Sequence, residues 1–113
     1  MTPDEFRQLA LSLPESTTSQ HMDHPDFRVR NKVFATLGYP DDEWGMIKLT
    51  TQQQAVFVHS HPGIFQPVKG GWGRKGATNV RLTNASPEIV REAMAIAWRN
   101  VAPAMLGKQF KDV

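Results

Sequence analysis

The chain has 113 residues, of which 40% are hydrophobic and 21% are charged, and its formal net charge is +2. This composition predicts a single folded domain over residues 1–113 and argues against wholesale disorder. Cysteine is absent, which excludes disulfides, thiolate metal sites and cysteine nucleophiles. No apolar run approaches the length of a membrane span and the first residues do not resemble a signal peptide, so we expect a cytoplasmic protein without a membrane role.

A short amphipathic helix is the first predicted element. Thr2 supplies a capping hydroxyl, Pro3 takes the first helical position, and Glu5 completes a capping box. Apolar residues follow at helical spacing up to Pro14, namely Phe6, Leu9, Ala10 and Leu13. The polar segment 16–25 that comes next fits either an edge strand or a loop.

Residues 26–38, DFRVRNKVFATLG, predict a β-hairpin. Apolar and basic side chains alternate before the turn, and Asn31 tolerates the positive φ that a tight turn requires. Continued alternation after the turn places Phe34 and Thr36 on the face opposite Val33, Ala35 and Leu37. A further strand is predicted over residues 44–50, WGMIKLT.

A second helix is predicted to begin at Thr50 or Thr51, because Gln53 or Gln54 would complete a capping box. Pro62-Gly63 ends this helix, and residues 64–76 show no periodicity and are expected to form a loop. The next strand begins at Ala77, and a long amphipathic helix follows the capping residue Ser86.

This order of elements, α-β-β-β-(β)-α-β-α, predicts an α+β fold. Strands joined by hairpins pair antiparallel, so we expect a twisted antiparallel sheet of about five strands. The helices must bury their apolar sides against one face of that sheet, which gives a two-layer sandwich.

The segment GGWGRKGATNVRL, residues 70–82, leaves several interpretations open. Glycine-rich backbone can cradle a phosphate, but the phosphate loop of nucleotide-hydrolysing enzymes needs GxxxxGK[ST] at the start of a helix, and here the segment leads into a strand. It can instead be a turn with Trp72 at the edge of the core, or a basic wing. The cations of that wing would be Lys69, Arg74, Lys75 and Arg81.

The hairpin has the same basic character. Arg28 and Arg30 lie two apart in a strand and therefore on one face, with Lys32 after the turn. Two such elements could form a double wing that contacts the phosphates of double-stranded DNA. The solvent face of any antiparallel sheet also needs polar residues, and the alternation is equally compatible with that simpler role. If the wing is real, removing two arginines should flatten the salt dependence of binding by about two units.

Catalytic and metal motifs are absent from the sequence. His21 and His24 flank Asp23, but no HExxH or comparable metal-binding framework is present. No serine lies in a G-x-S-x-G motif, and Ser86 is better explained as a helix cap. We therefore expect no catalytic residue, no metal, no cofactor and no enzymatic activity.

A ligand pocket is the alternative to a nucleic-acid surface. His59 and His61 with Trp72 could line such a pocket between loops, which would make the protein a small-ligand or protein-interaction module. The aromatic residues are otherwise most simply core filler, although an exposed Phe34 or Trp72 beside the cations could stack on bases.

Taken together, these segments resemble the MmcQ/YjbR family over nearly the whole chain. The most specific parts are the F-x-V-x-x-K-V-F-A hairpin from Phe27 to Ala35, the strand end Lys48-Leu49 and the segment from Trp72 to Leu82. The resemblance implies a small bacterial cytoplasmic domain with a frataxin-like or secretion-chaperone-like sheet. It also implies DNA binding through a double-wing motif, and it carries over no catalytic position.

The expectation from the sequence is therefore a non-enzymatic protein that binds DNA weakly through phosphate contacts. The predicted contact residues are Arg28, Arg30, Lys32, Lys69, Arg74, Lys75 and Arg81.

Overall fold

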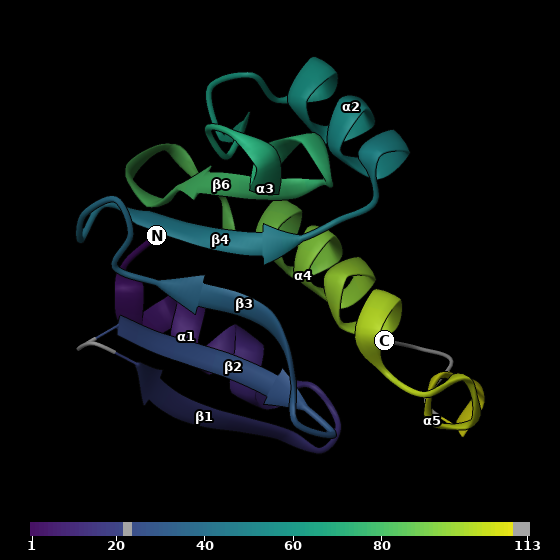
Figure 1. Ribbon diagram of the computed structural model, residues 1–113. Helices are drawn as coiled ribbons and strands as arrows, with labels where there is room; N and C mark the ends of the chain where they lie inside the picture. The colour runs from purple at the N-terminus through teal and green to yellow at the C-terminus, as the bar shows by residue number, and fades with distance from the viewer. Residues whose placement is uncertain (22–23, 110–113) are drawn as a thin grey trace.

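The computed structural model describes residues 1–21 and 24–109. Within them, six strands form one antiparallel sheet in the order β1-β2-β3-β4-β6-β5 (Figure 1). The strands are β1 Ser16–His21, β2 His24–Val29, β3 Lys32–Leu37, β4 Trp44–Lys48, β5 Phe65–Pro67 and β6 Ala77–Arg81. The helices are α1 Pro3–Ser12, α2 Thr51–Ser60, α3 Gly71–Arg74, the 3₁₀ helix η1 Leu82–Asn84, α4 Pro87–Val101 and α5 Ala104–Gln109.

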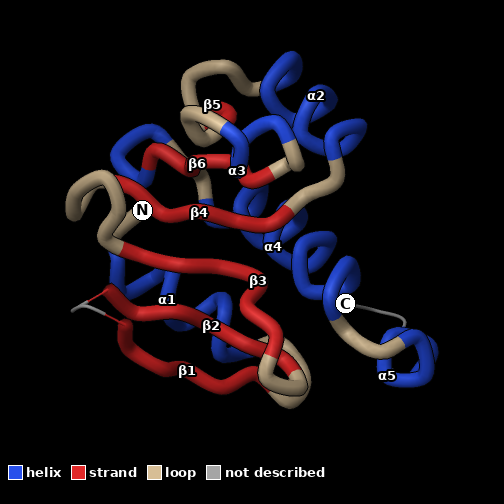
Figure 2. The backbone as a smooth tube through the Cα atoms, in the orientation of Figure 1, coloured by secondary structure: helices blue, strands red, loops and turns tan. Residues whose placement is uncertain are grey.

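Two layers form the body of the domain. Figures 1 and 2 view the sheet from one face, with α1 and α4 packed behind it. The core lies between these layers, and its largest fully buried side chains include Phe6, Phe27, Ile47, Val80 and Trp98. The predicted α+β sandwich is confirmed, while α2 packs against β5 at the edge of the sheet, where the Phe57 and Phe65 ring centroids lie 5.1 Å apart.

Local capping interactions begin the helices as predicted. The Thr2 side chain accepts a hydrogen bond from the Glu5 amide at 3.1 Å, and the Glu5 carboxylate accepts one from the Thr2 amide at 2.9 Å. For α2, the structure selects Thr50 with Gln53 among the two capping boxes that the sequence allowed. The Ser86 side chain caps α4.

The predicted hairpin of β2 and β3 turns at Arg30 and Asn31, whose φ angles are 50° and 66°. Its alternation is interrupted by a bulge, because Phe27 pairs with Ala35 and Arg28 pairs with Val33, which leaves Phe34 without a partner on β2. Phe34 is fully buried, which agrees with the core role predicted for the aromatic residues and excludes the alternative of an exposed Phe34 that stacks on bases. The extra residue of a bulge changes which side chains of its strand face the core.

The face away from α1 and α4 is built from alternate residues of the central strands. In β4, Gly45 and Ile47 are buried, whereas Trp44, Met46 and Lys48 are only partly covered. In the neighbouring β6, Asn79 pairs with Met46 and Arg81 pairs with Trp44. Aromatic, amide and basic side chains therefore gather on this second face.

Candidate nucleic-acid interface

The loop predicted over residues 64–76 contains a strand and a helix that sequence periodicity could not reveal. β5 pairs with β6, and three residues separate β5 from the four-residue α3. The Gln54 side chain of α2 donates hydrogen bonds to the carbonyls of Gly73 at 3.0 Å and Ala77 at 2.9 Å, which fixes both ends of the turn that connects α3 to β6.

Glycine is required in this segment by close backbone contacts. A Cβ atom on Gly73 would lie 1.6 Å from the carbonyl oxygen of Val68, and one on Gly76 would lie 2.0 Å from that of Leu49. Gly76 also has a φ of +110°, a conformation that residues with a side chain rarely adopt. These glycines let the chain fold tightly back on its neighbours.

Three backbone amides at the end of this segment are used within the fold. Those of Arg74, Lys75 and Gly76 donate to carbonyl oxygens of residues 70–73 at 3.0–3.2 Å. A phosphate cradle needs several such amides that point outward together. These three amides are taken and the segment leads into β6, so the structure favours the turn over the phosphate cradle among the interpretations that the sequence left open.

A groove crosses the second face of the sheet beside this turn. Its volume is about 790 Å³. It is lined by Thr36, Tyr39, Pro40, Trp44, Met46, Gln66, Pro67, Val68, Lys69, Trp72, Ala77 and Asn79. Tyr39 and Trp72 are 66% and 65% exposed, so these rings contribute little to the core. No aspartate, glutamate or histidine is among these lining residues.

Cations lie against two of the groove's aromatic rings. The Lys48 ammonium is 5.6 Å from the centroid of the Trp72 ring, and the Arg81 guanidinium is 5.5 Å from that of Trp44. A smaller pocket of about 270 Å³ adjoins the groove, since Trp72 lines both, and it is also lined by Lys48 and Lys75. Positive charge and exposed aromatic surface therefore occur together here.

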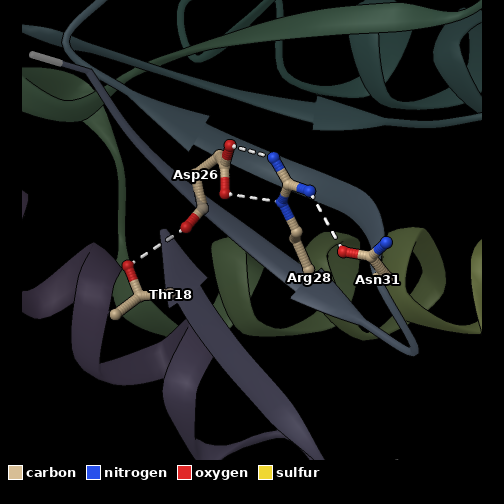
Figure 3. Close-up of polar contacts among 4 residues, drawn as sticks. All are labelled: Thr18, Asp26, Arg28 and Asn31. Carbon is tan, nitrogen blue, oxygen red and sulfur yellow. Dashed lines mark hydrogen bonds and ion pairs between the residues drawn. The ribbon is translucent and has the colours of Figure 1, made fainter. Parts of the chain in front are cut away.

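Arg28 of the hairpin is held by an internal ion pair. Its Nε and Nη2 atoms donate to the Asp26 carboxylate, each at 3.0 Å, and its Nη1 atom donates to the Asn31 side chain at 3.2 Å (Figure 3). The hydrogen bonds that Arg28 donates to the Asp26 carboxylate raise the pKa of Arg28 above its ordinary value. Asp26 is buried, and Thr18 donates to its backbone carbonyl at 3.1 Å, so this pair is part of the sheet.

Arg30 at the hairpin turn also has a carboxylate partner. Its Nε and Nη2 atoms donate to Glu15 at 2.7 and 3.2 Å. These hydrogen bonds lower the pKa of Glu15 below its ordinary value, so the pair is ionised at neutral pH. Two of the three predicted hairpin cations are thus neutralised locally, and Lys32 is the one without an ion-pair partner among residues 1–21 and 24–109.

The other predicted cations lie at or beside the groove. Lys69 lines the groove, Lys75 lines the adjoining pocket, and Arg74 is exposed at the end of α3. Over the described ranges 1–21 and 24–109, no side chain forms an ion pair or hydrogen bond with the side chains of Lys69, Arg74 or Lys75.

The predicted histidine pocket is divided in the structure. Trp72 lines the groove, whereas His59 lies in the last turn of α2 and His61 caps that helix and packs on Phe65. Neither histidine is among the residues that line the groove or the adjoining pocket. The described part of the chain contains no group of three histidine or acidic residues that could hold a metal ion. Asp23 and the side chain of His21 lie outside the described part.

Sequence reasoning missed Tyr39, Trp44, Gln66 and Asn79 as groove residues, and Lys48 as a residue of the adjoining pocket. A usable signal existed for the residues of β4 and β6, because Trp44, Met46 and Lys48 alternate with buried positions as Asn79 and Arg81 do. Gln66 reaches the groove through the sheet order, which places β5 next to β6, and Tyr39 reaches it from the loop between β3 and β4.

The comparison with protein families decides the relationship of this chain. The YjbR family model matches residues 11–100. The chain belongs to the YjbR family. The resemblance predicted from the hairpin and the Trp72 segment is therefore confirmed.

A solved structure extends this relationship to the fold. The crystal structure of Deinococcus radiodurans protein DR2400, which carries a DUF419 domain, is similar with a TM-score of 0.75 at 18% sequence identity. The similarity covers 97% of this chain and 88% of that one. No curated protein matches the chain. None of the helices in the described residues is long and apolar enough to cross a membrane.

Proposed function

We propose that this YjbR-family protein binds DNA without catalysing a reaction, through phosphate contacts at the groove face rather than at the hairpin. The contact residues are Lys48, Lys69, Arg74, Lys75 and Arg81. The observation that carries the proposal is the meeting of these cations around α3 and the groove, with no acidic residue lining the groove or the adjoining pocket.

Charge pairing explains why the groove face is preferred to the hairpin. A lysine binds a phosphate and releases a counterion only if its charge is not already compensated. Arg28 and Arg30 each face a carboxylate within the fold. The net charge of +2 is small, so we expect weak and strongly salt-dependent binding that reads little sequence.

The test is a fluorescence-anisotropy titration of a labelled mixed-sequence duplex at several salt concentrations. A duplex presents phosphates but no free base faces, so it isolates the electrostatic contribution. Each phosphate contact contributes about 0.9 to the slope of log affinity against log salt concentration. The variant Lys69→Gln/Lys75→Gln should therefore lose about two units of slope, and absence of binding at low salt would refute the proposal.

A small-ligand site is the second candidate function, and the groove itself favours it. Its volume of about 790 Å³ falls within the usual range of ligand pockets, about 300–1,000 Å³. Such a site, or a protein-interaction surface, predicts saturable binding that is nearly independent of salt. The same titrations distinguish these functions from DNA binding.

A further inference from the structure

We infer that the DNA form this surface prefers is a single strand, with an unpaired base stacked on Trp72 in the groove and its phosphate beside Lys48 and Lys75. This inference rests on the proposed function, because the phosphate contacts are the same. It adds a site for the base, which the groove supplies and which a flat basic surface would not.

The exposed aromatic rings are the first argument for base binding. Trp72 is 65% exposed on α3, and Tyr39 is 66% exposed in the loop between β3 and β4. Both line the same groove, with Trp44 also contributing to it. Aromatic side chains on an open sheet face are the usual platform for unpaired bases, because every base has a flat π-face.

Neutral amides in the groove are the second argument. Gln66 of β5 and Asn79 of β6 are cross-strand partners, and both line the groove. An amide side chain can both donate and accept hydrogen bonds, as the edge of an unpaired base requires. In a duplex these edges are paired and the base faces are covered by neighbouring base pairs, so the groove could not reach them.

The position of the lysines is the third argument. Trp72 lines both the groove and the adjoining pocket, and the pocket contains Lys48 and Lys75. The Lys48 ammonium already lies 5.6 Å from the Trp72 ring centroid. A base on the exposed part of this ring would therefore carry its phosphate next to two positive charges. The lack of acidic lining residues favours a polyanion over a basic peptide.

The experiment compares three labelled probes at one low salt concentration, namely an oligothymidylate, an abasic strand of the same length and a duplex. The abasic strand keeps the phosphates and removes the bases. The oligothymidylate should bind about 5- to 150-fold more tightly than the abasic strand, the range expected for one stacked base. Trp72→Ala should abolish this preference, and Trp72→Phe, which keeps a ring, should retain most of it.

The control is Val56→Ala, an exposed apolar residue of α2 that lines neither the groove nor the adjoining pocket. This variant should change neither the affinity for the oligothymidylate nor the affinity for the abasic strand. If the oligothymidylate and the abasic strand bind equally and with steep salt dependence, this inference is overturned, while the proposed phosphate contacts remain supported. A base preference that survives Trp72→Ala would also overturn it. If no probe binds at low salt, the proposed function itself fails.

Discussion

Replacing Gly76 by alanine is expected to destabilise the segment that carries the groove's cations. The new Cβ atom would lie 2.0 Å from the carbonyl oxygen of Leu49 and 3.0 Å from the carbonyl carbon of Thr50. Both neighbours are backbone atoms, so no side chain can rotate to make room. The residue would also have to keep a φ of +110°.

The expected loss can be estimated from these contacts. A residue with a side chain at such a φ costs about 1–3 kcal/mol. Moving the backbone apart would also break the hydrogen bond from the Leu49 amide to the Gly76 carbonyl at 3.3 Å, which contributes about 1 kcal/mol. Alanine recovers a little free energy by restricting the unfolded chain. We therefore expect the free energy of unfolding to fall by about 3 kcal/mol.

Urea denaturation measures this change, and Gly71→Ala is the matched control. Gly71 has an ordinary φ, and a Cβ atom there would lie 3.7 Å from the flexible guanidinium of Arg74. Alanine there should leave stability unchanged or raise it by about 0.5 kcal/mol. If Gly76→Ala and Gly71→Ala shift the unfolding midpoint by the same amount, the assigned backbone contact is refuted.

Three further predictions concern charge and packing. The double variant Glu15→Gln/Arg30→Gln removes an ion pair without changing the net charge. It should leave the salt dependence of duplex binding unchanged, because the charge of Arg30 is already compensated by Glu15. A shallower slope of log affinity against log salt concentration in anisotropy titrations would contradict this prediction. The pKa of Glu15 is lower in the folded protein than in the unfolded chain. The ionised Glu15 carboxylate therefore stabilises the fold at a pH above its unfolded pKa, and this contribution is lost as the pH falls through its lower folded pKa. The stability difference between the wild type and Glu15→Gln, measured by urea denaturation, should therefore close on acidification, and a widening difference would be inconsistent. Trp98→Phe removes part of a fully buried side chain and its hydrogen bond to the Pro14 carbonyl at 3.0 Å, and should lower the free energy of unfolding by about 1–3 kcal/mol. Thermal melting of Trp72→Phe should show almost no change at that exposed position, and an equal loss in both variants would refute the assigned burial.

The helices α1, α2 and α4 were predictable because their signals are local. A capping box uses residues three positions apart, as Thr2 with Glu5 and Thr50 with Gln53 show. The turn at Arg30 and Asn31 was equally accessible, since asparagine tolerates a positive φ. In each case the interacting groups lie within a few residues of one another in the chain.

The missed elements depend on contacts between distant residues. β5 is only three residues long and α3 is only four, which is too short for a hydrophobic period to develop. The α3 segment is held by Gln54, which lies 19 residues before Gly73. The bulge that buries Phe34 likewise reflects pairing with β2 and packing in the core, neither of which alternation can predict.

The candidate site was predicted in part. Alternation correctly placed Arg81 on the exposed face of β6. The Asp26–Arg28 pair was accessible to the same reasoning, because residues two apart in a strand share a face. Glu15 lies 15 residues from Arg30, and only the folded chain brings the two together. Local sequence therefore could not show that the charge of Arg30 is compensated while those of the lysines near the groove are not.

The location of DNA binding is tested most directly by ¹H–¹⁵N NMR spectra recorded while a short mixed-sequence duplex is added at low salt. The account predicts chemical-shift changes in the backbone amides of residues 69–76 and in the Trp72 indole. The Trp98 indole, which is held by the Pro14 carbonyl, should not change and serves as an internal control. Changes confined to residues 28–32 of the hairpin, or no changes at all, would contradict it.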